Sequence, residues 1–159
     1  MSNGKYRPRP QVNTKRVMAD LQAFSMQANV SGEIITQKTG YTLAAVDFDG
    51  AINKVWLSVA ASGKDSSNTL AIEADVFING TTCLTTKPKI AHVSGETSQQ
   101  KTTLGSAADT GITEAVLLDT AKSFNAGDVL TYNFELTRTS SPTTEIKAPC
   151  LVVELMPTK

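Results

Sequence analysis

The sequence contains few of the residues that most often carry chemistry in proteins. Its 159 residues include one histidine, His92, and two cysteines, Cys83 and Cys150. Zinc sites are built from several His or Cys ligands, and this chain lacks such a set. Neither a Ser-His-Asp arrangement nor a glycine-rich phosphate-binding loop is found. We therefore expect a protein that is not an enzyme and has no catalytic residues, metal or cofactor, and we interpret His92 as a solvated loop histidine.

Long apolar runs are also missing. No stretch approaches the length of about 20 apolar residues that a membrane-spanning helix needs. The first 16 residues, MSNGKYRPRPQVNTKR, lack the apolar segment of a secretory signal. We therefore expect a protein made in a reducing cytosol, without membrane association. Cys83 and Cys150 lie in apolar, strand-like runs, which favours two buried thiols, while a disulfide between them stays open.

Charge is unevenly distributed, although the net charge of the chain is zero. Residues 1–16 contain five basic and no acidic side chains, which leaves a net charge of −5 on the remainder. Pro8 and Pro10 remove amide donors and disfavour helix, so this segment predicts an extended arm. Such an arm can contact phosphates or an acidic protein surface. Because Tyr6 is its only aromatic residue, we favour protein docking or disorder and do not expect nucleic acid as a partner.

Residues 14–28, TKRVMADLQAFSMQA, fit two structures. Thr14 can cap a short helix, and the apolar residues fall near one helical face: Val17, Leu21, Phe24 and Ala28. The same stretch could instead pair as an edge strand. We assign residues 1–30 to an extended basic N-terminal arm, including the short helix if it forms, and residues 31–159 to the folded domain.

From about residue 30 the apolar residues tend to recur at every second position, as in β-strands. INKVWLSVAA (52–61) is rich in β-branched and aromatic residues. LAIEADVFIN (70–79) has a mostly polar face and an apolar face made of Leu70, Ile72, Ala74, Val76 and Ile78. Asn79-Gly80 supplies the two positive φ angles of a tight turn, so residues 70–85 predict a hairpin. Residues 86–111 predict a long polar loop. The fold class is therefore all-β, an antiparallel β-sandwich of jelly-roll type with an extended N-terminal arm.

The segment FNAGDVLTYNFELTRTS, residues 124–140, predicts a turn followed by a core strand. Asn125 and Gly127 supply turn geometry, and Asp128 is an exposed acid at the strand entrance. Alternation then turns four side chains inward: Leu130, Tyr132, Phe134 and Leu136. Arg138 continues this inward-facing series, and a buried charge needs a partner. It therefore either lies past the end of the sheet or pairs with a carboxylate.

Two further groups are candidates for binding. Asp47 and Asp49, in AVDFDGA, fit half of a calcium loop, but the other oxygen ligands and the closing glutamate are missing. We interpret Asp49-Gly50 as a β-turn with Asp47 facing solvent. Trp56 and Tyr132 could belong to an exposed aromatic platform for sugar rings, together with Tyr41 and Phe77, but we favour burial of both in the core.

Residues 122–155, KSFNAGDVLTYNFELTRTSSPTTEIKAPCLVVEL, resemble the C-terminal part of small β-sandwich proteins on tailed-phage virions. The likeness lies in the run GDVL (127–130), the strand end LTRT (136–139) and the proline-containing turn before the last hydrophobic strand. The Asn-Gly hairpin and the Thr/Ser-rich loop are similar in style, so the resemblance covers about the last 110 residues. Capsid decoration (cement) proteins are the family that we name.

This resemblance implies a non-enzymatic structural protein that binds the outside of a phage capsid and stabilises it. It implies a homotrimer that contacts the major capsid protein and is located in the virion after synthesis in the host cytoplasm. The arm is then a clamp that can add a strand to a sheet edge of another chain or lie on an acidic surface. The predicted capsid-binding residues are Tyr6, Arg7, Arg9, Lys15 and Arg16. The alternative is a glycan-binding or host-recognition module of a phage fibre, which needs an exposed aromatic side chain.

Overall fold

The structure, a computed structural model, describes residues 22–96, 100–105 and 110–158, which form strands and turns without any helix. The strands are β1 (Phe24–Asn29), β2 (Glu33–Ile34), β3 (Lys38–Ala45), β4 (Gly50–Val59), β5 (Ala71–Ile78), β6 (Thr81–Thr82), β7 (Leu84–Thr86), β8 (Lys89–Ala91), β9 (Lys101–Thr102), β10 (Ile112–Thr113), β11 (Val116–Leu117), β12 (Ser123–Phe124), β13 (Val129–Thr137), β14 (Ile146–Lys147) and β15 (Cys150–Pro157).

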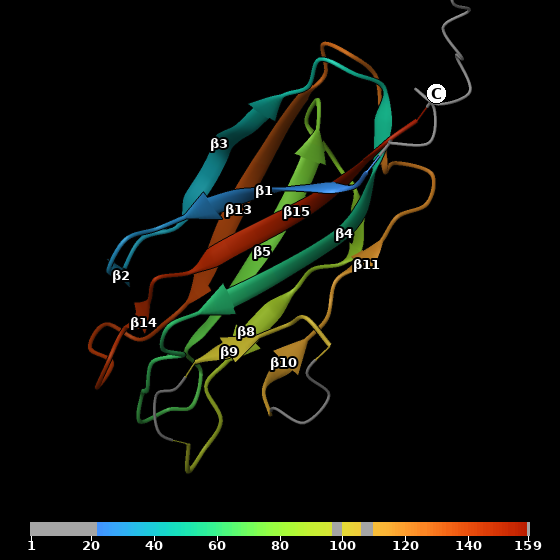
Figure 1. The fold of residues 1–159 in the computed structure, drawn as a ribbon. Coiled ribbons are helices and arrows are strands. Elements are labelled where there is room, and N and C mark those ends of the chain that lie inside the picture. The colour runs from blue at the N-terminus through green and yellow to red at the C-terminus, as the bar shows by residue number, and fades with distance from the viewer. Residues whose placement is uncertain (1–21, 97–99, 106–109, 159) are drawn as a thin grey trace, which may run out of the picture.

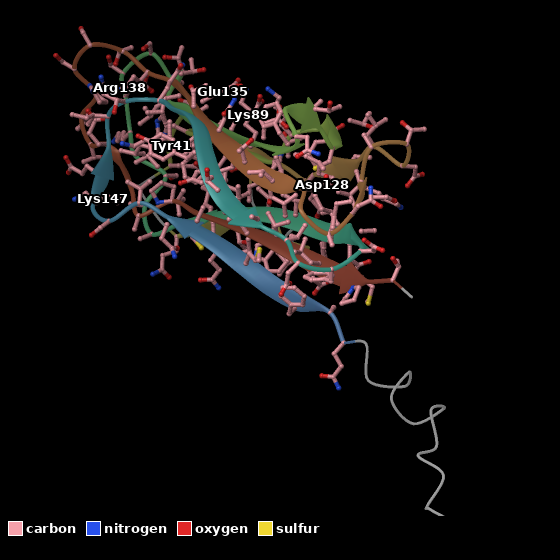
Figure 2. All side chains as sticks on the ribbon, turned by 90° about the horizontal axis from the view of Figure 1, so that it is seen from above. Tyr41, Lys89, Asp128, Glu135, Arg138 and Lys147 are labelled. Atoms are coloured by element: carbon pink, nitrogen blue, oxygen red, sulfur yellow. The ribbon has the colours of Figure 1, made fainter. Side chains whose placement is uncertain are left out.

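Two antiparallel sheets form the layers of a β-sandwich. The β15 sheet has the order β1-β15-β4-β12, with β9 also paired to β4, and the β13 sheet has the order β10-β8-β5-β13-β3, with β6 also paired to β5. Figure 1 shows the β15 sheet lying obliquely across the β13 sheet, and Figure 2 shows the two layers one beside the other. The predicted all-β antiparallel sandwich is confirmed. The chain passes repeatedly between the sheets, as a jelly roll requires, but the jelly-roll assignment itself stays a prediction.

Alternate residues of β13 and β15 fill the core. Leu130 and Phe134 are fully buried in β13, and the Tyr132 and Phe134 rings meet edge to face with centroids 5.2 Å apart. Leu136 is partly buried against the same cluster. The predicted inward face of this strand is therefore confirmed. From the other sheet, β15 contributes three side chains without exposed surface: Leu151, Val153 and Leu155.

The predicted hairpin is confirmed at its turn but is shorter than its sequence indicates. The predicted core face of residues 70–79, which include β5, is buried at all five positions: Leu70, Ile72, Ala74, Val76 and Ile78. Asn79 and Gly80 have φ angles of 48° and 83°, as the turn requires. After Cys83 the chain leaves β5, because β7 pairs with β11 and β8 takes the place beside β5.

The start of the folded domain differs from the prediction. Residues 24–29 form β1, which pairs with β15, so a helix over this part of 14–28 is wrong and the edge-strand alternative is confirmed. Met26 and Ala28 face the core, while the residues that alternate with them, Ser25, Gln27 and Asn29, are exposed. The stretch forms a strand and not a helix because all six residues of β1 can pair with β15. The sandwich therefore includes β1 and does not begin at residue 31.

The described parts of the polar segment 86–111 contain strands where the sequence predicts a loop. These strands are β8 and β9, and both are paired to longer strands. His92 is only 4% exposed and its backbone N–H donates to the carbonyl of Leu70 at 2.7 Å, so the prediction of a solvated loop histidine is wrong. The histidine is buried because β8 pairs with the inner strand β5 and His92 continues this pairing beyond the end of β8.

Both cysteines are free thiols. Cys83 is fully buried, and burial together with the negative charge of Asp75 raises the pKa of its thiol to about 12. Cys150 is only half-buried, and burial raises the pKa of its thiol as well. The prediction of two buried thiols is confirmed for Cys83 and holds in part for Cys150.

The ends of β13 are fixed by polar contacts. Asp128, at the strand entrance, is partly exposed and accepts hydrogen bonds from the N–H of Asn125 at 2.8 Å and from the Asn79 side chain at 2.7 Å. These two hydrogen bonds lower the pKa of its carboxyl group. At the far end, Arg138 forms an ion pair with Glu145, which confirms that it pairs with a carboxylate.

Candidate functional site

A cleft of about 400 Å³ opens on the side of the sandwich where β4 faces β11. Segments that are far apart in sequence line it: residues 53–55, 103–105 and 114–117, with Asp119 and Lys122. Its rim carries two exposed apolar side chains, Leu104 at 37% and Val116 at 51%. A cleft with apolar side chains and a few polar groups is the usual form of a small binding site.

The floor of this cleft is the free middle of the outer edge of β4. β12 pairs with the first two residues of β4, and β9 pairs with the last two. On the same edge, the N–H of Leu57 donates to Thr103 Oγ1 at 3.0 Å, and its carbonyl accepts from the Thr103 N–H at 2.8 Å. Because bonding directions alternate along an antiparallel strand, the N–H and carbonyl of Val55 point the same way. They provide one backbone donor and one acceptor in the cleft.

A buried ion pair holds the wall of the cleft that contains residues 103–105. The Lys101 side chain is 1% exposed and is paired with Glu96. Its Nζ also donates to the carbonyls of Thr110, at 3.0 Å, and Ala91, at 3.5 Å. Burial tends to raise the pKa of Glu96, but hydrogen bonds from Lys101 and Thr110 and the Lys101 charge lower it overall. The segments before and after the ion pair are thereby tied to each other and to β8.

The cleft contains charges of both signs. Asp119 Oδ1 accepts from Lys122 Nζ at 2.6 Å, and this hydrogen bond, with the Lys122 charge, lowers the pKa of Asp119. Lys54 and Glu114 are exposed, and neither has an ion pair among the described residues. The arrangement suits non-covalent binding of a polar or zwitterionic group, because a donor, an acceptor and both charges are available.

Among the described aromatic residues the most exposed one lies away from this cleft, on β3. Tyr41 of β3 is 48% exposed, its ring centroid is 6.0 Å from that of Tyr132, and Lys38 Nζ lies 5.6 Å from its centroid. Figure 2 shows Tyr41 on the outer strand of its layer. Core burial is confirmed for Tyr132, whereas Trp56 is only partly buried and lies outside the core cluster.

A compact charge cluster covers the outer face of the β13 sheet. Lys87 Nζ lies 3.5 Å from Glu73, 3.4 Å from Asp75 and 3.1 Å from Glu135. Burial tends to lower the pKa of Lys87, but the hydrogen bond to Glu135 and the negative charges of Asp75 and Glu135 raise it overall. Figure 2 shows Glu135 and the neighbouring Lys89 pointing outward from this face. On this face the positive charge of Lys87 is therefore paired with carboxylates and is not free.

The residues predicted from the sequence to bind a capsid lie outside the described residues: Tyr6, Arg7, Arg9, Lys15 and Arg16. Asp47 is exposed, as predicted, and Asp49 Oδ1 accepts from the Ala126 N–H at 2.8 Å. Over the described ranges, no group of three or more His, Cys, Asp and Glu side chains could hold a metal ion. The cleft could not be predicted from the sequence, because three separate segments and two further residues build it and none of them carries a local motif.

Comparison with known proteins gives no relative from which a role could be transferred. No family model matches the sequence, and no curated protein matches it. Within residues 22–158, apart from the two undescribed gaps, no helix is long and apolar enough to cross a membrane. Function must therefore be argued from the residues themselves.

We expect Lys101→Met to destabilise the protein strongly. The substitution leaves the Glu96 carboxylate buried without its counterion, which typically costs about 3–5 kcal/mol. Urea unfolding at neutral pH measures the loss. Lys122→Met is the matched control, because it removes an exposed ion pair and should change stability little. Equal losses in the two variants would contradict the role given to Lys101.

The acid unfolding of a Glu96→Gln variant should differ from that of the wild type. The pKa of Glu96 is lowered in the folded protein, so its carboxylate stabilises the fold above its unfolded pKa of about 4.3, and this contribution is lost as pH falls through the folded pKa. We expect the variant to be less stable at neutral pH and to show a flatter loss below about pH 4.3. Stability measured from pH 7 to pH 2 tests this, and parallel curves would count against it.

Proposed function

We propose that this chain is a non-enzymatic structural protein that binds the outside of a phage capsid and stabilises it, with residues 1–16 as the principal contact. One observation supports the arm as the contact: β1, the first described strand, is an edge strand of the β15 sheet. The chain therefore enters the sandwich at a sheet edge and not through the core. Contacts made by the preceding residues do not require the sandwich to open.

Charge supports the same arrangement. The five basic side chains of residues 1–16 are separated in sequence from a remainder with net charge −5. An acidic capsid surface attracts such a segment and repels the body, which orients the protein with its arm toward the capsid. The resemblance to decoration proteins implies a homotrimer bound to the major capsid protein. We adopt both as part of the proposal.

The test is binding of the full-length chain to phage capsids after neutralisation of the arm. We expect the quadruple variant Arg7→Gln, Arg9→Gln, Lys15→Gln and Arg16→Gln to bind roughly tenfold more weakly or worse, because each lost ion pair contributes up to about 1 kcal/mol. Co-sedimentation with capsids at several salt concentrations measures the affinity. The salt dependence should weaken in the variant.

A control variant with the same change of net charge replaces four lysines of the body by glutamine: Lys54, Lys64, Lys89 and Lys147. If this control loses as much affinity as the arm variant, the effect is non-specific and the role of the arm is wrong. The trimer is tested separately, since it requires a mass of three chains of 16.9 kDa or a multiple of three chains.

A second candidate function is recognition of glycans as a module of a phage fibre. Exposed Tyr41 favours it, because the ring can contact the apolar face of a sugar while the Lys38 ammonium group, which lies over the ring, contacts the sugar hydroxyls. The cleft beside β11 offers a second polar site with a backbone donor and acceptor.

Tyr41→Ala should abolish glycan binding if this second candidate is correct. Tyr41→Phe keeps the ring and should retain most of the affinity, because stacking depends on the ring face. A glycan array probed with the three proteins gives the answer. No signal from the wild-type chain, or equal signals from wild type and Tyr41→Ala, would exclude Tyr41 as the platform.

A further inference from the structure

The free edge of β1 carries a regular row of unpaired backbone groups. The Val30 N–H donates to the Pro149 carbonyl at 3.0 Å, which continues the register between β1 and β15. Because bonding directions alternate, Ala28, Met26 and Phe24 also bond toward β15. The N–H and carbonyl groups of the three residues in between, Ser25, Gln27 and Asn29, therefore point away from the sheet. The described residues offer these groups no partner.

Within the described residues, β1 lacks the intrinsic features that usually protect an edge strand. Natural edges are blunted by short length, by bulges, by proline or by charged side chains. β1 has six residues, FSMQAN, without charge or proline, and its register with β15 has no shift. In Figure 1 it lies at the margin of its sheet, beside β15.

The other long edge strand, β3, is protected. It has two register shifts against β13, a glycine at φ 70° (Gly40), and Lys38 at its start. β10 and β12 have two residues each, which is too short to accept a strand. The outer edge of β4 is paired with β12 at one end and β9 at the other, and only its middle is open, at the cleft. The contrast with β3 singles out β1 among the edge strands that the structure describes.

The sequence of β1 is self-complementary about Gln27. If a second β1 pairs antiparallel with Gln27 opposite its copy, Ser25 lies opposite Asn29, and both faces then match. Side chains on the core side form the apolar pairs Phe24 with Val30 and Met26 with Ala28. The outer side carries only uncharged polar pairs. No like charges oppose each other, and each outward N–H and carbonyl finds a partner.

We propose that β1 is a docking edge for a second copy of this chain, which pairs antiparallel about a twofold axis at Gln27 and joins the two β15 sheets. The 39% exposure of Phe24 fits this contact, because an apolar side chain at the end of an edge strand would be covered by Val30 of the second copy. The occupant is a copy and not an unrelated strand, since an unrelated strand has no reason to match both faces of β1 in one register.

This contact goes beyond the proposed capsid function and does not depend on it. A twofold contact uses the same surface on both copies, whereas a trimer closes through a different surface on each copy. The two are compatible, because a trimer with free β1 edges would pair with a second trimer. The expected mass is therefore an even multiple of 16.9 kDa, two or six chains.

The test compares the full-length wild type with Gln27→Lys. Gln27 is exposed in a single chain, so the substitution should leave the fold intact, but across the twofold axis it places two lysines opposite each other. We expect the dissociation constant of the pairing, measured by sedimentation over a range of concentrations, to rise roughly tenfold or more. Thr39→Lys adds the same charge at an exposed position of the protected edge strand β3 and should not change it.

Amide hydrogen exchange provides a second readout. Backbone amides of Ser25, Gln27 and Asn29 should exchange more slowly as the wild-type concentration rises, and this protection should disappear in Gln27→Lys. A wild-type mass of one or three chains with fast exchange at these amides overturns the proposal. Protection that appears only when another protein is added also overturns it, because the occupant is then a foreign strand. Neither result depends on capsid binding, so the two proposals fail separately.

Discussion

The burial of one face of each sheet against the other is the constraint on which the rest of the structure depends. β13 and β15 lie inside their sheets with a strand on each side, so their backbone groups are paired and their alternate side chains can be fully buried. Phe134 from one layer and Leu155 from the other have no exposed surface. The turns, the short strands and the cleft are attached to this pair of layers. Removing apolar area here would affect every other element, whereas changes at the edges leave the layers intact.

Sequence predicted the fold where the information is local. β5 and β13 alternate apolar and polar residues over most of their length, and Asn79-Gly80 can adopt the positive φ angles that a tight turn requires. β1 could not be assigned, because Phe24 and Ala28 fit a helical face while Met26 and Ala28 fit a strand face. The decision depends on β15, which lies more than a hundred residues away in the sequence. Local pattern carries no information about that partner.

The candidate sites were less predictable than the fold for the same reason. The wall of the cleft depends on Lys101 and Glu96, and polar residues in a Ser/Thr-rich segment look solvated until their partners are known. The cost of burying this pair is offset by further hydrogen bonds. The carbonyls of Thr110 and Ala91 accept from Lys101, and the Thr110 hydroxyl donates to Glu96. His92 follows the same rule, since pairing of β8 with β5 buries it. Sequence alone does identify the basic segment 1–16, because charge and proline content are local properties.

The edge of β1 and the basic segment 1–16 have different roles in the two proposals. Antiparallel pairing about Gln27 would place the Phe24 ends of the two strands at opposite ends of the shared sheet. A paired molecule would carry two copies of the basic segment, one from each chain. It would therefore have two attachment segments joined through one continuous sheet. Two weak attachments linked rigidly bind more tightly than either alone, because the second forms at a high effective concentration. Pairing through β1 would thus strengthen attachment to any repetitive surface, of which a capsid is one.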